Sequence, residues 1–133
     1  MEAHQKQITV YSNHTESAPV IYLPVVVGDG SEVYECCREL DCPPFTLVTI
    51  GGLDWNRELS PWACDGTVRD AEPFGGQAAS FLDELLSQII QQVESSLPQP
   101  PVWRGIAGYS LAGLFALWAL WQTNAFDRAA SAS

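Results

Sequence analysis

Three largely apolar runs constrain the fold of this chain most, since the first is rich in β-branched residues and each of the three stops at a glycine. They cover Val20–Val27, Phe45–Ile50 and Val102–Ala107. Continuous apolar runs of this length are typical of strands buried on both faces, as in parallel sheets. Shorter segments at Ile8–Tyr11 and Arg128–Ser133 predict two further strands.

Helical patterns separate these strands. Apolar residues recur at helical spacing over Glu32–Leu40 and Gln77–Ser95, and a third helix is expected over Leu111–Gln122. The segment Leu53–Gly76 predicts a long loop, and such loops are commonly functional. The alternation of strand and helix predicts an α/β fold, a three-layer sandwich with a mostly parallel sheet, as a single domain over residues 1–133.

The charge of the chain argues against anionic partners. It carries 16 acidic and 6 basic side chains, a formal charge of −10. Nucleic acid and anionic membrane surfaces repel such a protein, so neither is expected as a partner. No basic stretch followed by an apolar run opens the chain, and we expect a cytoplasmic protein.

One segment is long and apolar enough to suggest a membrane span. Gly105–Phe126 contains no charged side chain and is flanked by Arg104 and Arg128. Its first half is rich in glycine and serine, and polar residues 122–124 end it. These features favour a strand, a turn and a helix over a membrane span.

The four cysteines, at positions 36, 37, 42 and 64, contain no Cys-x-x-Cys pair. The sequence therefore predicts no metal site and no cofactor. Cys36 and Cys37 lie at core spacing in the first helical pattern and are expected to be reduced, buried residues. A disulfide between Cys42 and Cys64 stays open, since both fall in expected loops.

The turn at Gly108–Gly113 is the most informative motif. Its spacing is that of Gly-x-Ser-x-Gly, with Ala112 in place of the second glycine, and it lies between an expected strand and an expected helix. Small residues two before and two after the serine permit a strained turn that exposes Ser110 over the carboxyl edge of the sheet. The N–H of Leu111 can then stabilise an oxyanion. The alternative is an ordinary turn in which Ser110 caps the helix.

Four segments in order resemble the esterase D-like, enterochelin esterase-like family of α/β hydrolases. In chain order they are Val26–Gly30, Asn56–Pro61, Gly108–Leu117 and Phe126–Ser133. Gly108–Leu117 is similar to the nucleophile elbow of the family. The resemblance spans nearly the whole chain. It implies a partial α/β-hydrolase fold and hydrolysis of small-molecule carboxylic esters.

The resemblance also implies roles for single residues. Ser110 would be the nucleophile, Leu111 would donate one oxyanion N–H, and the loop at Asp29 and Gly30 would supply the other. Side chains expected to contact substrate are Arg57, Trp55 and Tyr109. For two groups the residues alone leave a choice: Arg57 with Glu58 orients substrate or forms a solvated ion pair, and Trp55 with Trp62 lines a pocket or covers the sheet end.

A catalytic base is missing from this pattern. Beyond Ser110 the chain contains no histidine and a single acid, Asp127, while His4 and His14 precede the first buried strand and are expected to be surface residues. A serine hydroxyl is a poor nucleophile without a base. We therefore expect a chain shortened at its C-terminal end, with weak or no hydrolysis alone. The competing class is a non-catalytic assembly protein, and an exposed strand at 128–133 predicts a homodimer or higher oligomer.

Overall fold

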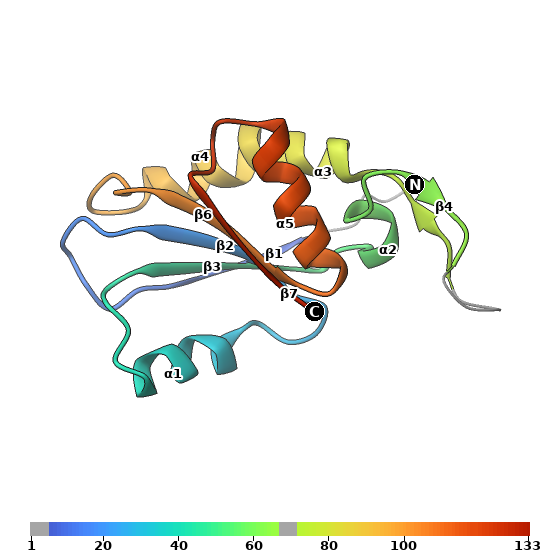
Figure 1. Ribbon diagram of the computed structural model, residues 1–133. Helices are drawn as coiled ribbons and strands as arrows, with labels where there is room; N and C mark the ends of the chain where they lie inside the picture. Colours follow the sequence, from blue (N-terminus) through green and yellow to red (C-terminus); the bar gives the residue numbers. More distant parts are fainter. Residues whose placement is uncertain (1–5, 67–71) are drawn as a thin grey trace.

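A five-stranded sheet forms the centre of the molecule in the computed structural model, which describes residues 6–66 and 72–133 (Figure 1). The strand order is β1-β3-β2-β6-β7. Neighbouring strands are parallel except for β1, which pairs with β3 in the antiparallel direction. Two parallel strands need a long crossover that returns the chain to the end of the sheet where the first strand began. Residues 12–19 between β1 and β2 are too few for such a crossover, so β1 runs antiparallel to the others. The strands are β1 (Gln7–Tyr11), β2 (Val20–Pro24), β3 (Thr46–Gly51), β6 (Arg104–Tyr109) and β7 (Arg128–Ala132).

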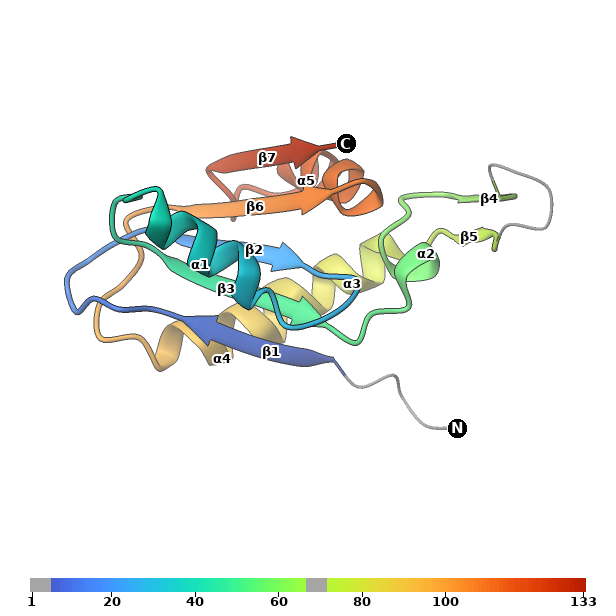
Figure 2. The same ribbon diagram turned by 90° about the horizontal axis from the view of Figure 1, so that it is seen from below.

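Helices cover both faces of the sheet, which confirms the α/β, three-layer expectation. Figure 1 shows α1 on one face and α3, α4 and α5 on the other. Viewed from the α1 side in Figure 2, α1 lies in front of β2 and β3 and leaves β6 and β7 uncovered among the described residues. In the part of the chain that the structure describes, no helix has the length and apolar character needed to cross a membrane. The helical elements that cover the sheet are α1 (Ser31–Glu39), α3 (Ala78–Glu84), the π-helical segment η1 (Leu85–Ile89), α4 (Ile90–Ser95) and α5 (Leu111–Gln122).

The hydrophobic core lies between the sheet and the α3–α5 layer. Tyr22 and Ile106 from the strands are fully buried against Phe81 and Phe115 from the helices. The rings of Phe81 and Phe115 lie 5.1 Å apart. The expected amphipathic helix over 77–95 is confirmed as one continuous helical stretch, because its apolar stripe supplies most of this layer's buried residues.

Helix α1 differs from expectation in the face that it buries. Its one buried side chain is Tyr34, which stacks on Tyr11 of β1 with ring centroids 5.2 Å apart. Cys36 is exposed and Cys37 only half-buried, so the prediction of two core cysteines was wrong. The helix lies over β2 and β3, and its apolar stripe faces a groove beside β2 rather than a closed core.

The predicted end of the second strand and the predicted loop over 53–76 also differ from the structure. The second strand ends at Pro24 rather than Val27, and Val26 and Val27 are 65% and 80% exposed, because the chain leaves the sheet for a glycine-rich loop. The expected loop over 53–76 contains a helical turn, α2 (Trp55–Glu58), and a small hairpin. That hairpin pairs β4 (Ala63–Cys64) with β5 (Phe74–Gly75). All four cysteines are free, so Cys42 and Cys64 form no disulfide here.

Candidate active site

Ser110 occupies the turn between β6 and α5 with a positive φ of 59° and a ψ of −123°, a conformation that a residue with a β-carbon rarely adopts. Its backbone N–H donates to the carbonyl of Ala132 in β7 at 2.8 Å. Its own carbonyl accepts hydrogen bonds from the N–H groups of Gly113 and Leu114 at 2.9 and 3.2 Å. The turn is therefore held from both sides. Strained backbone of this kind is typical of catalytic turns.

Two glycines make this turn possible. A β-carbon at position 108 would overlap the carbonyl group of Ala112, and one at position 113 would lie 2.6 Å from the hydroxyl oxygen of Ser131. Position 108 behaves as the motif predicts. The packing of Gly113 against β7 was missed, since it depends on a strand distant in sequence.

The hydroxyl of Ser110 does not cap the helix that follows it. Helix α5 has no side-chain cap hydrogen bond, and the residue is exposed. Of the two expectations for this turn, the structure therefore disagrees with the N-cap. The first N–H groups of a helix lack intrahelical partners and carry its positive end, and here the first of them belongs to Leu111. A hydroxyl and a donor for an oxyanion thus share one helix terminus.

The loop that contains Asp29 and Gly30 is anchored by hydrogen bonds to Asp29. The carbonyl of Asp29 accepts hydrogen bonds from the hydroxyls of Tyr11 and Thr49 at 2.8 and 2.7 Å. Its carboxylate accepts the N–H of Ser31 at 3.0 Å, and this bond lowers the pKa of Asp29. Among the described residues, the hydrogen bonds of this loop run to β1, β3 and α1, on the far side of β2 from β6.

The side chains expected to contact substrate lie on two elements. Tyr109, at the end of β6, is 64% exposed beside Ser110. Trp55 of α2 packs against the core, whereas Trp62 is 59% exposed. Trp55 is therefore partly buried, and whether the two tryptophans line a pocket or cover the sheet end stays a prediction.

Arg57 and Glu58 do not pair with each other. Arg57 is an exposed side chain that lies 3.8 Å from the carboxylate of Asp54. Glu58 instead contacts the ammonium group of Lys6 at 2.7 Å. The solvated Arg57–Glu58 ion pair was thus the wrong partnership, and Arg57 is left at the surface of α2.

The lysine of this contact was not anticipated from the sequence. Lys6 precedes β1, whose Gln7 pairs with Gly51, so it lies at the carboxyl edge of β3. Its ammonium group also contacts Glu84 at 2.8 Å, and its side chain is only 9% exposed. Burial would lower the pKa of Lys6, but the hydrogen bonds and charges of the two carboxylates outweigh it and raise the pKa. No local pattern could reveal a cluster drawn from three separate elements.

The remaining candidates for a catalytic triad lie at the opposite edge of the sheet. His14 is in the β1–β2 connection, where its ring contacts the hydroxyl of Thr46 at 3.4 Å at the start of β3. Asp127 precedes β7 and accepts the backbone N–H of Arg104 at 3.0 Å. Ser110 follows the carboxyl end of β6, so neither group can reach it. His4 lies outside the described residues.

A comparison with known proteins identifies the family of this chain. The family described as "Putative esterase" matches residues 7–133. The chain belongs to this esterase family. An uncharacterized protein of Bacillus subtilis (strain 168), YbbA, is 30% identical over 120 residues, which is 83% of this chain and 46% of that protein.

Solved structures agree with the family in fold. The IroE-like serine hydrolase from Shewanella oneidensis superposes with a TM-score of 0.75 at 20% identity, over 93% of this chain and 44% of that one. The siderophore hydrolase EstA from Aspergillus nidulans has a TM-score of 0.70 at 24% identity, over 93% of this chain and 51% of that one. The fold is that of the α/β hydrolases, and the chain spans about half the length of these relatives.

Proposed function

We propose that this chain carries the nucleophile half of an esterase that hydrolyses small-molecule carboxylic esters. The observation that carries the proposal is Ser110, an exposed hydroxyl on a strained turn that leaves the helix behind it uncapped. In the proposed reaction Ser110 Oγ attacks the ester carbonyl carbon, and the alcohol leaves from the resulting tetrahedral intermediate. Water then releases the acid from the acyl-enzyme.

The developing oxyanion needs two donors. The N–H of Leu111 supplies the first, at the positive end of α5. We assign the second to a backbone N–H of the loop at Asp29 and Gly30, which follows β2, the strand next to β6. Tyr109 and Arg57 border this edge and contact the substrate. The family description, "Putative esterase", supports an ester as the substrate class, and the IroE-like and siderophore neighbours are hydrolases by name.

The base comes from outside the described residues. His14 is at the wrong edge of the sheet, and no described residue beyond Ser110 is a histidine. We propose that the isolated chain turns over weakly or not at all. The loss of a triad member typically costs about 10⁴-fold or more in rate.

A short-chain p-nitrophenyl ester and a fluorophosphonate probe test this proposal together. We expect slow labelling at Ser110 and negligible turnover, and Ser110→Ala should remove the labelling. Ser87→Ala is the matched control, since Ser87 is an exposed serine whose hydroxyl donates to the carbonyl of Asp83 at 2.7 Å. Labelling that survives Ser110→Ala would remove the serine from the mechanism. Ready turnover that Ser110→Ala abolishes would show that a base is already present.

A second candidate function is self-association without catalysis, which the outer surface of α5 favours. This helix is apolar all round, and helices of that kind are normally buried. It packs against β6 and β7, yet it exposes an apolar row that lies beside the unpaired edge of β7. We propose a homodimer or higher oligomer through this edge and this row. The exposed residues of the row are Leu114, Leu117, Leu120 and Trp121, the last 88% exposed.

Sedimentation at micromolar concentration tests the association. The wild type should sediment as a dimer or larger species, and Leu117→Glu with Trp121→Glu should give a monomer. Val102→Glu is the control, because Val102 is 61% exposed but precedes the amino end of β6, away from the apolar row of α5. A monomeric wild type excludes this assembly.

A further inference from the structure

The C-terminal end of α1 is closed by a hydrogen-bonded turn that begins and ends at cysteine. The N–H of Asp41 donates to the carbonyl of Arg38 at 3.1 Å, and the N–H of Cys42 donates to the carbonyl of Cys37 at 3.1 Å. Asp41 between them is left-handed, with φ 53°. These two bonds around a left-handed residue define a Schellman motif. That motif brings the side chains of its first and last residues together, and here they are Cys37 and Cys42.

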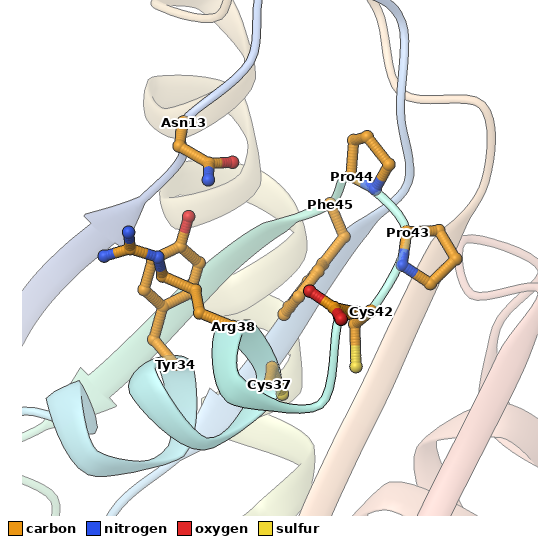
Figure 3. Close-up of a pocket in the computed structure, with 9 residues that line it drawn as sticks. Asn13, Tyr34, Cys37, Arg38, Cys42, Pro43, Pro44 and Phe45 are labelled. Atoms are coloured by element: carbon orange, nitrogen blue, oxygen red, sulfur yellow. The ribbon is translucent and has the colours of Figure 1, made fainter.

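Both thiols face the same two hollows of the surface. One is a polar pocket of about 290 Å³ and the other an apolar groove of about 350 Å³ beside β2, and each is lined by Cys37 and Cys42. Figure 3 shows the pocket, with the two cysteines near Phe45 and with Arg38 and Tyr34 on the neighbouring turns of α1. Cys42 is exposed, whereas Cys37 is half-buried. Small thiol reagents can therefore reach Cys42 first.

We propose that Cys37 and Cys42 form a dithiol site that low-molecular-weight disulfides oxidise to an intramolecular disulfide. The 3.1 Å backbone bond between the two residues holds their α-carbons at a separation that disulfides use. The left-handed Asp41 fixes this separation in the folded chain. The site is independent of Ser110 and of the proposed esterase reaction.

The order of the two steps follows from exposure. The thiolate of Cys42 attacks one sulfur of the small disulfide, so that a mixed disulfide forms and one small thiolate leaves and takes up a proton. The thiolate of Cys37 then attacks the Cys42 sulfur and releases the second small thiol. The two cysteines lose two electrons and two protons, and the small disulfide gains them.

The microenvironment suits these roles. Burial, and then the neighbouring Cys42 and Cys36 thiols, raise the pKa of the Cys37 thiol. A thiol of that kind is a slow first attacker, and it resolves a mixed disulfide because its target is already in place.

Oxidised glutathione tests the site on the full chain. In a Cys36→Ser/Cys64→Ser background, which removes the other thiols, we expect the protein to lose the mass of two hydrogens and to show a Cys37–Cys42 crosslink in a peptide map. A further Cys37→Ser change should instead trap one glutathionyl group on Cys42. A stable mixed disulfide at Cys42 while Cys37 is still present would overturn the proposal.

The folded geometry is tested separately from mere closeness in sequence. The equilibrium constant for the disulfide should fall about tenfold or more when the same protein is unfolded in concentrated urea. Asp41→Val should lower it about fivefold in the folded protein, because a β-branched residue resists the left-handed conformation, and Asp41→Gly should not lower it. Equal constants in folded and unfolded protein would show that the turn contributes nothing.

Discussion

Gly108 and Ala112 meet across the turn that carries Ser110, so closely that a β-carbon on residue 108 would overlap the carbonyl group of Ala112. This contact links the end of β6 to the first turn of α5. The serine between them has a positive φ of 59° and is exposed. The geometry of the candidate nucleophile therefore depends on a missing side chain two residues away.

Gly108→Ala should destabilise the protein and remove probe labelling at Ser110. The added methyl group would overlap the carbonyl group and the β-carbon of Ala112, neither of which can rotate away, and overpacking of this kind costs about 3 kcal/mol. Gly51→Ala is the matched control, because a β-carbon there has its nearest neighbours at 3.7 Å, ordinary contact, in a backbone of normal φ. Urea unfolding measures both variants. Similar losses of stability in the two would contradict the steric explanation.

Ser110→Gly should stabilise the fold while it removes the nucleophile. A serine with φ 59° is strained, and glycine adopts this conformation without a β-carbon, so the gain should be about 1 kcal/mol. Ser87→Gly, within the π-helical segment η1, should lose stability by about the same amount. Thermal unfolding compares the two signs. A loss of stability in Ser110→Gly would show that the turn is unstrained.

The parts of the fold that the sequence predicted are those with a strong local pattern. Helix α5 begins at Leu111 and ends at Gln122 as expected, because a glycine turn precedes it and polar residues end its apolar run. The turn at Ser110 was predictable for the same reason. The buried face of α1 was not predictable, because Tyr34 is buried by stacking on Tyr11. That residue belongs to another element and lies beside α1 only in the folded chain. The contacts of Lys6 with Glu58 and Glu84 could not be predicted for the same reason, since folding brings the three residues together from separate elements.

The ion pair between Glu94 and Arg104 should be strongly coupled. The guanidinium donates two hydrogen bonds to the carboxylate, at 2.6 and 2.8 Å, and the hydroxyl of Tyr22 donates a third at 2.8 Å. The carboxylate side chain is only 12% exposed, so Arg104→Met alone leaves a poorly solvated charge and should cost about 3 kcal/mol. A double-mutant cycle with Glu94→Gln should give a coupling above about 1 kcal/mol.

The exposed pair Arg38 and Glu35 provides the comparison for that cycle. Its side chains are 57% and 60% exposed, and its coupling should be below about 0.5 kcal/mol. Equal couplings in the two pairs would mean that burial does not strengthen the Glu94–Arg104 contact.

Lys6 should make the stability of the fold sensitive to alkaline pH. Its pKa in the folded protein is raised above the ordinary value of 10.5 by Glu58 and Glu84. The stabilisation is therefore complete below the unfolded-state pKa and is lost as the pH rises through the folded-state pKa.

Lys6→Met should cost about 2 kcal/mol at neutral pH, because it leaves two carboxylates facing each other without a cation. The deficit should shrink above pH 10.5, where the wild type also loses the charge. Urea unfolding on both sides of that pH measures the difference, and Arg57→Met, which removes an exposed cation on α2, should show only a small effect throughout. A deficit for Lys6→Met that stays constant across this range would mean that the packing of the lysine stem, and not its charge, supplies the stabilisation.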